Sequence, residues 1–506
     1  MAQEITIRLI LVAVVCFGGS SLQFGYNLAV VNAPEPILKA FFKDVKSFDT
    51  FLWPFAVAIF AIGGMCGAFI GPHIATKVGR KNTLLLNNIL AICGGLLLAF
   101  TKPAKLVGLL IFARILLGLN AGVNTVVAPM YLSEIAPVNL RGSLGTINQF
   151  GIVSGLLLAN ILGLPQLLGT EKGWPYLFGM TAVVAAVQLC LLPFCPESPR
   201  FLLLNKQDSA AITNLRLLRG YENVDDEVEA IKLDVERDAS VKHTTVLELL
   251  MNRNYRKPLI ISIVMQLSQQ LSGIGGILSY STSLFIKLGM DEKNGPAATC
   301  GVGALSVVMT GITVVLVEVS GRRRLMLIGL GGMVVCYSIV TVSLVFKSAS
   351  WAKVLAVVST LASVTAFQIG PGPIPWFIVG ELFTQSSIAA AVSIAGPTNW
   401  LGNFAVSLVY PKMQDKIHPY TFIPFEILLI LFFLFTYYFV PETKGRTVAE
   451  ISAVFRNNYA STDVEKHVQE LFNFYTNVGP ETFAGHKRLF CILDNFSSKT
   501  ISYQSL

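Results

Sequence analysis

Twelve long apolar runs, separated by short polar segments, constrain this chain more than any other feature of its sequence. A helix needs about 20 residues to cross roughly 30 Å of hydrocarbon. The runs cover residues 8–31, 52–71, 83–101, 106–132, 143–164 and 174–195, and then 258–288, 298–318, 325–346, 352–382, 389–411 and 419–440. They predict an all-α membrane protein with twelve transmembrane helices, for which the lipid bilayer is one partner.

The composition agrees with this prediction and excludes several other classes of protein. Hydrophobic residues make up 53% of the chain and charged residues 13%, which is about half the charged content of soluble domains. The net charge of +8 lies in short clusters between the apolar runs, so no nucleic-acid partner is expected. The eight cysteines are scattered without metal-ligand spacing. No nucleotide-binding loop or nucleophile–base pair stands out, and we expect neither an enzyme nor a cofactor.

The two halves of the chain repeat each other. Gly79-Arg80-Lys81 recurs as Gly321-Arg322-Arg323, Glu134 as Glu381, and Pro196 to Arg200 as Pro441 to Arg446, at offsets of 242, 247 and 245 residues. Such a constant offset predicts two similar six-helix bundles with a binding site at their interface near the midplane. The expected divisions are an N-terminal bundle at 1–195, linker helices at 196–257, a C-terminal bundle at 258–440 and a tail at 441–506.

Arginine gives the orientation of the bundles. Outside the apolar runs, Arg8, Arg80, Arg141, Arg322 to Arg324 and the arginines of the linker and tail fall on one side. Cytoplasmic loops carry the excess of basic residues. Both termini are therefore expected in the cytoplasm, although the lysines are spread over both sides.

One face of the seventh run carries three amide side chains. Gln266, Gln269 and Gln270 are spaced at i, i+3 and i+4, and unpaired amides are costly against lipid. Gly273, Gly275 and Gly276 follow at once and favour a break in the helix. An amide-lined face beside a helix break indicates a site for a neutral, hydroxyl-rich solute. Interhelical hydrogen bonding alone is the other interpretation.

A second break is predicted in the tenth run. Residues Gly370, Pro371, Gly372, Pro373, Ile374 and Pro375 cannot form a regular helix, because each proline lacks a backbone donor. Broken backbone at membrane depth is expected beside a cavity. The two breaks suggest hinged segments that close over a bound solute, whereas a kink without gating is the alternative.

Several ordered motifs resemble the sugar porters of the major facilitator superfamily, and more closely the animal facilitative hexose transporters. The resemblance covers about residues 1–456 and implies the major facilitator fold. Its motifs are SLQFGYN (Ser21 to Asn27), NAP (Asn32 to Pro34), PMYLSEIAP (Pro129 to Pro137), LRGSLGTINQFGIV (Leu140 to Val153), PESPRFLL, QLSQQLSGI, GRRRLMLIGL, GPGPIPWFIVGELF (Gly370 to Phe383), Asn399-Trp400 and VPETKGRT (Val440 to Thr447). The seventh-run motif is typical of the glucose-preferring branch, and LLLNN (Leu84 to Asn88) is closer to the fructose-type branch.

The resemblance implies a set of sugar-binding and gating residues. The binding amides are Gln149, Gln269, Gln270 and Asn403, and the aromatic residues are Trp376 and Trp400, with Phe24 and Phe367 as weaker candidates. The sequence departs from the family pattern at three site positions, where Gly275 and Ser306 replace asparagines and Gln368 replaces a glutamate. The gating residues are Gly273, Gly276, Tyr280, Gly370, Pro371, Pro373 and Pro375.

The resemblance also implies a network of charges at the cytoplasmic ends of the spans, with salt bridges that link the two halves when the site faces out. Its members are Arg80, Arg114, Glu134, Arg141, Glu197, Glu318, Arg322, Arg323 and Glu381. Arg114 lies within the fourth span, and we expect a carboxylate partner for it, such as Glu197. The arginine that the family has shortly after Glu381 is replaced by Ile388.

The first span lacks a proton carrier. Proton-coupled sugar porters carry an aspartate where this chain has Asn27, and an amide does not exchange a proton at physiological pH. The sequence therefore predicts facilitative uniport of a hexose, with glucose as the expected substrate, across the plasma membrane. Alternatives are a fructose, polyol or urate facilitator, a proton-coupled symporter, and a sugar sensor that signals through its tail. The sequence carries no signal for an oligomeric state.

Overall fold

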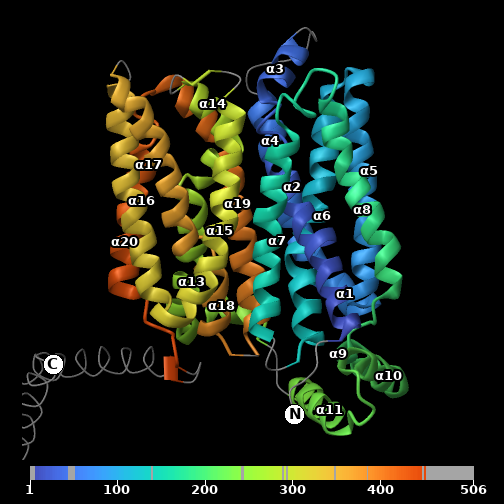
Figure 1. Ribbon diagram of the computed structural model, residues 1–506. Coiled ribbons are helices and arrows are strands. Elements are labelled where there is room, and N and C mark those ends of the chain that lie inside the picture. The colour runs from blue at the N-terminus through green and yellow to red at the C-terminus, as the bar shows by residue number, and fades with distance from the viewer. Residues whose placement is uncertain are drawn as a thin grey trace, which may run out of the picture. The chain divides into compact units, whose positions relative to one another are not determined.

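The apolar runs form helices because each can close its own backbone hydrogen bonds, and every secondary-structure element of the described residues is helical. The computed structural model describes residues 6–43, 52–137, 141–240, 244–287, 290–291, 294–346, 349–384, 386–446 and 450–451. Figure 1 shows the helices that precede the linker on the right and those that follow it on the left.

The first half contributes six membrane-length segments. The first of them is continuous but not regular, because a π-helical turn joins two α-helices. Their bounds are α1 (Ile7–Val15), η1 (Cys16–Ser21), α2 (Leu22–Ala29), α3 (Glu35–Lys43), α4 (Leu52–Val78), α5 (Arg80–Ala104), α6 (Val107–Ile135), α7 (Arg141–Leu162), α8 (Trp174–Leu191) and η3 (Leu192–Phe194).

The second half has the same number of segments, two of which are divided. The expected run at 258–288 is split into two helices, and so is the run at 352–382. The bounds are α13 (Arg253–Leu271), α14 (Ile274–Lys287), α15 (Gly295–Ser320), α16 (Arg322–Val345), α17 (Ser350–Ile369), α18 (Ile374–Leu382), α19 (Ile388–Lys416) and α20 (Ile423–Phe439). Both predicted breaks are thus confirmed.

Nine helical segments of the described residues are long and apolar enough to cross a membrane. The other three predicted spans correspond to α7, α19 and α20. The apolar parts of α7 and α20 are shorter, at Ile147–Leu162 and Ile423–Phe439. Helix α19 is long, but it carries the polar residues Asn399 and Asn403.

Four short helices connect the halves, namely α9 (Pro199–Leu204), α10 (Asp208–Arg219), α11 (Asp225–Ser240) and α12 (Val246–Met251). Helices α9–α11 lie at one end of the molecule, here called the linker end, and α3 lies at the opposite end, here called the α3 end (Figure 1). Linker helix α10 caps the first half: Thr6 Oγ1 donates to the Leu218 carbonyl at 2.8 Å, and Arg219 Nη1 donates to the Ile135 carbonyl at 2.9 Å.

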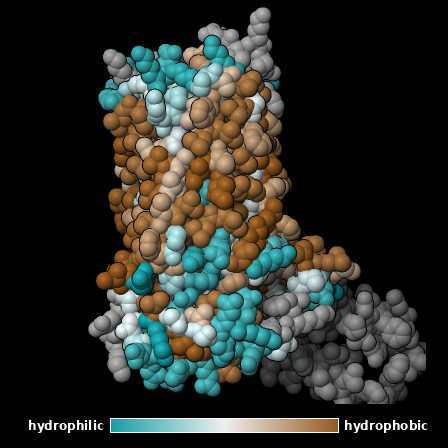
Figure 2. All heavy atoms as spheres, turned by 90° about the vertical axis from the view of Figure 1, so that its right-hand side faces the viewer, coloured by the Kyte–Doolittle hydropathy of each residue, from teal (hydrophilic) through white to brown (hydrophobic). Residues whose placement is uncertain are grey.

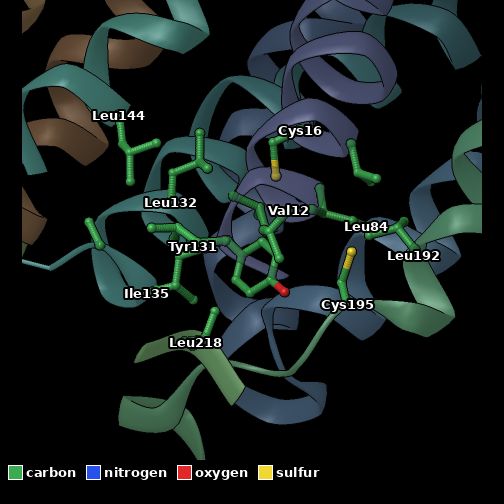
Figure 3. Close-up of a cluster of buried hydrophobic side chains, with 14 of the residues drawn as sticks. Val12, Cys16, Leu84, Tyr131, Leu132, Ile135, Leu144, Leu192, Cys195 and Leu218 are labelled. Carbon is green, nitrogen blue, oxygen red and sulfur yellow. The ribbon is translucent and has the colours of Figure 1, made fainter. Parts of the chain in front are cut away.

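Apolar side chains fill the contact between α10 and the first half. Leu218 lies in a buried cluster with Val12 of α1 and with Leu132 and Ile135 of α6, and Figure 3 shows these side chains converging from the three helices. Burial contributes about 25 cal/mol per Å² of apolar surface removed from water. The linker is therefore part of the fold of the first half.

The outer surface of the helices is apolar. Ile89 and Leu96 of α5 and Val187 of α8 are exposed, and Figure 2 shows apolar side chains over the middle of this face with polar ones gathered toward both ends. This banded pattern is the one that a bilayer requires of a spanning protein.

Glycines allow the helices to approach closely. A Cβ atom on Gly122 of α6 would overlap the carbonyl oxygen of Gly64 of α4, and one on Gly155 of α7 would overlap the carbonyl oxygen of Leu22 of α2. Small residues at such crossings permit backbone contact between transmembrane helices. The α4–α6 and α2–α7 crossings consequently depend on glycine.

Replacing Gly122 by alanine is expected to lower the thermal unfolding midpoint in detergent, because the new methyl group forces α4 and α6 apart. Gly311→Ala is the matched control: it is also within a helix, but a Cβ there has no neighbour within 4 Å. Its midpoint should stay the same or rise, since alanine favours a helix by about 1 kcal/mol over glycine. Equal midpoints for the two variants would contradict the packing described here.

Candidate functional site

The break between α13 and α14 is built by glycine. Gly273 has a φ of +82°, which residues with side chains rarely adopt, and a Cβ there would lie 2.7 Å from Phe425 Cγ. A Cβ on Gly276 would overlap the ring of Tyr410. Tyr280 has non-helical angles within α14, with φ −134° and ψ 19°. Two of the predicted gating residues, Gly273 and Tyr280, thus lie where the backbone departs from a regular helix, and Gly276 allows α14 to pack against Tyr410.

The break between α17 and α18 leaves backbone carbonyls without their helical donors. Pro375 lacks the N–H that would reach Pro371 in a regular helix. The Trp376 N–H donates to Pro373 instead of to Gly372, at 3.2 Å. Unpaired carbonyls in a membrane interior cost several kcal/mol each, so these two must find donors elsewhere.

Gln269 of α13 supplies those donors. Its Nε2 donates to the Pro371 carbonyl at 3.2 Å and also to the Gly372 carbonyl. One helix thus completes the backbone hydrogen bonding of another about a hundred residues away in the sequence. In this structure both hydrogens of the Gln269 amide are committed to the break.

Gln266 and Asn399 extend the same arrangement. Gln266 Nε2 donates to the Pro375 carbonyl at 3.1 Å. Asn399 of α19 donates from Nδ2 to Gln266 Oε1 at 2.8 Å and to Gln269 Oε1 at 2.6 Å. All three side chains are buried. The prediction of helix–helix hydrogen bonding is therefore confirmed for Gln266, and Asn399, absent from the set of expected ligands, joins it.

Gln270 and Asn403 form the more accessible edge of this amide cluster. Asn403 Nδ2 donates to Gln270 Oε1 at 3.0 Å, and Gln270 Nε2 donates to Asn399 Oδ1 at 3.0 Å. Both Gln270 and Asn403 are only half-buried. Asn403 Nδ2 has a second hydrogen and Gln270 Oε1 a second lone pair, so this pair can bond a further polar group.

Gly275 lies against the same pair. A Cβ added there would be 3.7 Å from Asn403 Nδ2 and 3.9 Å from Gln270 Oε1, which are ordinary contacts. Neither a positive φ nor crowding requires glycine at this position, in contrast to Gly273 and Gly276. Its missing side chain therefore affects the surroundings of the amide pair rather than the fold.

Trp400 lies between the two halves. It is 5% exposed, and its ring centroid is 5.6 Å from that of Phe24 on α2 and 6.2 Å from that of Phe60 on α4. Its Nε1 donor is buried without a hydrogen-bond partner. The indole nitrogens of Trp53 and Trp174 are likewise buried without a partner, so the unpaired N–H alone does not distinguish Trp400 as a ligand-binding residue.

The remaining predicted ligands differ in what they offer. Gln149 on α7 is half-buried. Ser306 is buried, and its hydroxyl donates to the Val302 carbonyl of its own helix at 2.8 Å. Gln368 is 4% exposed beside the second break, and Trp376 is 36% exposed. Ser306 therefore retains only acceptor capacity for a ligand.

A junction at the α3 end was not among the predicted site residues, although Asn32 belongs to a motif noted in the sequence. Asn32 Nδ2 donates to the Leu278 carbonyl at 2.9 Å and to Ser281 Oγ at 2.7 Å, and Asn32 Oδ1 accepts from the Thr282 N–H at 3.3 Å. Asn32 belongs to the first half and the other three residues to α14. The halves are thus joined at the α3 end.

Three charged side chains at the linker end of the first half form a compact cluster with Ser198. Arg80 pairs with Glu134 at 2.7 Å. Glu197 Oε1 accepts from the backbone N–H groups of Arg80 at 3.0 Å and Lys81 at 3.1 Å, at the start of α5. A carboxylate at a helix N-terminus satisfies donors that have no partner within the helix. Ser198 donates to the second oxygen of Glu134.

The second half repeats this cluster residue by residue. Arg322 pairs with Glu381 at 2.8 Å. Glu442 accepts from the backbone N–H groups of Arg322 at 2.9 Å and Arg323 at 3.2 Å, and Thr443 donates to Glu381. The glycines that precede Arg80 and Arg322 share an unusual conformation, with φ/ψ of 99°/163° at Gly79 and 84°/162° at Gly321. The repeat in the sequence is therefore a repeat in structure.

These ion pairs each close within one half. The predicted links between the halves belong to a state in which the site faces out, and they stay a prediction. The side chains of two predicted members, Arg141 and Glu318, lie outside the described residues. Glu442 was not predicted, although the recurrence of the Pro-Glu motif indicated it.

The prediction of a carboxylate partner for Arg114 is wrong. Arg114 is 1% exposed, donates to the carbonyls of Asn27 at 2.6 Å and Val57 at 3.3 Å, and lies 4.4 Å from the Phe60 ring centroid. It lies near the start of α6, at the opposite end of that helix from Glu134. Arg114 therefore belongs to the core of the first half and not to the linker-end charges.

Comparison with known proteins agrees with this architecture. The family model described as "Sugar (and other) transporter" matches residues 11–455. The chain is 46% identical over 464 residues to solute carrier family 2, facilitated glucose transporter member 3 of Gallus gallus, covering 90% of this chain and 93% of that protein. The Homo sapiens protein of the same name is 44% identical over 473 residues, covering 91% and 95%.

Solved structures of a bacterial relative have the same fold. The inward-open xylose transporter XylE from E. coli matches with a TM-score of 0.75 and 26% identity over 88% of this chain and 99% of that one. A proton:xylose symporter XylE structure with bound 6-bromo-6-deoxy-D-glucose matches with a TM-score of 0.72 and 26% identity. The predicted all-α major facilitator fold is confirmed, and the chain belongs to the sugar transporter family of multi-pass membrane proteins.

Proposed function

We propose that this protein is a facilitative hexose transporter whose preferred substrate is glucose. The observation that carries the proposal is the half-buried amide pair Gln270–Asn403, with Trp400 three residues before Asn403 on α19. Amides bond neutral hydroxyl groups without the desolvation cost of a charge, and an indole adds an apolar face for a sugar ring. The facilitated glucose transporter relatives, at 44–46% identity, support the same substrate.

Alternating access is the mechanism that the fold supports. In transporters built from repeated bundles, one bundle rocks against the other around a site near the midplane. Gln269 holds the α17–α18 break and Gln270 belongs to the substrate pair. A substrate that binds Gln270 therefore contacts α13, the helix whose Gln269 supports the α17–α18 break and which itself ends at the break before α14. This coupling gives the proposed gating residues Gly273, Gly276, Tyr280, Gly370, Pro371, Pro373 and Pro375 their role.

The buried environment of Asn27 favours uniport over proton coupling. Asn27 is fully buried, and its Oδ1 accepts from Thr181 Oγ1 at 2.7 Å. The position that touches Arg114 thus carries a neutral amide. Transport then follows the hexose gradient alone.

We also propose that the protein lies in the plasma membrane with a defined orientation. The linker end faces the cytoplasm, as the arginine distribution predicts, with both termini inside and the protein in the plasma membrane. The chain divides into bundles at 1–195 and 258–440, linker helices at 196–257 and a tail at 441–506. The structure then has its outward side closed by the contacts of Asn32 with α14.

Purified protein in proteoliposomes is expected to take up labelled glucose saturably, with competition by other hexoses. A panel of glucose, fructose, a polyol and urate checks the substrate class. Uptake of the polyol or urate without any hexose would contradict the proposal. Deletion of residues 457–506 should leave sugar uptake intact in a transporter, whereas a sensor that signals through its tail would lose its output.

Gln270→Ala is expected to raise the KM for glucose about tenfold, because one or two hydrogen bonds worth about 1 kcal/mol each are lost. Gln266→Ala is the matched comparison on the same face. It removes the hydrogen bond from Gln266 to the Pro375 carbonyl and one of the two bonds that Asn399 donates, and it should lower stability by about 1–3 kcal/mol. Uptake kinetics and thermal unfolding separate the two effects, and an unchanged KM in Gln270→Ala would remove this residue from the site.

Gly275→Ala is expected to fold as stably as the natural protein and to change the order of preference among hexoses. A methyl group at this position makes only ordinary contacts, the nearest 3.7 Å from Asn403 Nδ2. Gly276→Ala should instead destabilise the protein, because its methyl group overlaps Tyr410. Thermal unfolding and hexose competition test this, and an unchanged preference in Gly275→Ala would show that the position does not affect selectivity.

A further inference from the structure

A buried carboxylate joins the two halves at the α3 end, outside the predicted site. Glu35 is the first residue of α3 and is 2% exposed. Its Oε2 accepts from Ser283 Oγ of α14 at 2.6 Å, and its Oε1 pairs with Lys39 Nζ at 2.7 Å. Ser283 belongs to the second half, so the hydrogen bond crosses between the halves.

We propose that Glu35 is a positioning residue of the transport cycle, which holds α14 closed through Ser283 and sets the balance between inward- and outward-facing states. The inference rests on the proposed function, because alternating access requires the halves to part at each end in turn. A bond between the halves at the α3 end must break whenever that end opens. The ion pairs of Arg80 and Arg322 close within single halves and can persist through the same motion.

The chemistry of the contact suits a bond that breaks in every cycle. An O–H donor to a carboxylate is stronger than a bond between neutral groups. Lys39 is on the same helix as Glu35, one turn away, and is 47% exposed. Lys39 moves with the Glu35 carboxylate, so opening of the α3 end breaks only the hydrogen bond to Ser283. The carboxylate keeps its partner, and the larger cost of an unpaired buried charge is avoided.

Glu35 acts beside the neutral contacts of Asn32. Asn32 holds Leu278, Ser281 and Thr282, and Glu35 holds the next residue along α14. Removing the Glu35 contact should therefore weaken the closure without abolishing it. Loss of a hydrogen bond to a charged group changes an equilibrium constant by about tenfold or more. We expect loss of the Glu35–Ser283 bond to shift the equilibrium between inward- and outward-facing states toward the outward-facing state by that factor.

The test compares Ser283→Ala and Glu35→Ala with Glu35→Gln, which keeps an acceptor for Ser283. Ser343→Ala is the matched control, because its hydroxyl donates to the Ile339 carbonyl of its own helix at 2.8 Å. The first readout is the KM for glucose entry and for glucose exit in proteoliposomes of known orientation. The second is hydrogen–deuterium exchange of peptides covering residues 274–287, which requires no transport.

Ser283→Ala and Glu35→Ala should lower the entry KM and raise the exit KM several-fold, because more of the protein has its site open to the outside. Exchange in 274–287 should become faster in both, with no further change in the double variant. Glu35→Gln should restore values close to those of the natural protein, and Ser343→Ala should match it throughout.

Unchanged exchange in 274–287 of Ser283→Ala would overturn the proposal, and so would equal changes of the entry and exit KM. If Glu35→Ala fails to fold, Ser283→Ala alone decides. Were no hexose transported at all, the proposed function would fail, while the exchange measurement would still decide whether Glu35 holds α14 closed.

Discussion

The rest of this structure depends on how two broken helices satisfy their backbone carbonyls inside an apolar bundle. The prolines and glycines of residues 370–375 leave Pro371 and Gly372 without helical donors, and Gln269 provides them. Because that glutamine lies on α13, directly before the other break at Gly273, the two irregular segments support each other. A polar face that would be costly against lipid becomes necessary once its partner helix is broken.

The same arrangement supports the proposed substrate site. The break takes up the amide donors of Gln266 and Gln269, and Asn399 donates to both glutamines. Gln270 and Asn403 remain at the accessible edge of the cluster, where they bond to each other and to Asn399. Binding groups work best when a supporting set of hydrogen bonds fixes their orientation. At the linker end, the matching clusters around Arg80 and Arg322 make each half rigid within itself. The contacts of Asn32 and Glu35 join the halves at the other end.

Much of this could be predicted from the sequence, and the failures have physical causes. Run length predicted the spans, glycine and proline predicted both breaks, and the constant offset predicted the repeated charge clusters. Periodicity placed Gln269 on a polar face but could not identify its partners, which lie about a hundred residues away. Arg114 was expected to need a carboxylate, yet two carbonyls and the ring of Phe60 surround it. A single sequence shows that a buried charge needs partners, and only the packing of helices shows which ones it has.

We propose that the amide site moves hexose passively, because Asn27 stands in place of a proton carrier. The decisive measurement is the ratio of internal to external labelled glucose at equilibrium, in proteoliposomes held under an imposed pH gradient. We expect a ratio of about one with or without the gradient, because a uniporter only equalises its substrate across the membrane. Accumulation above the external concentration, lost when the gradient is dissipated, would contradict it.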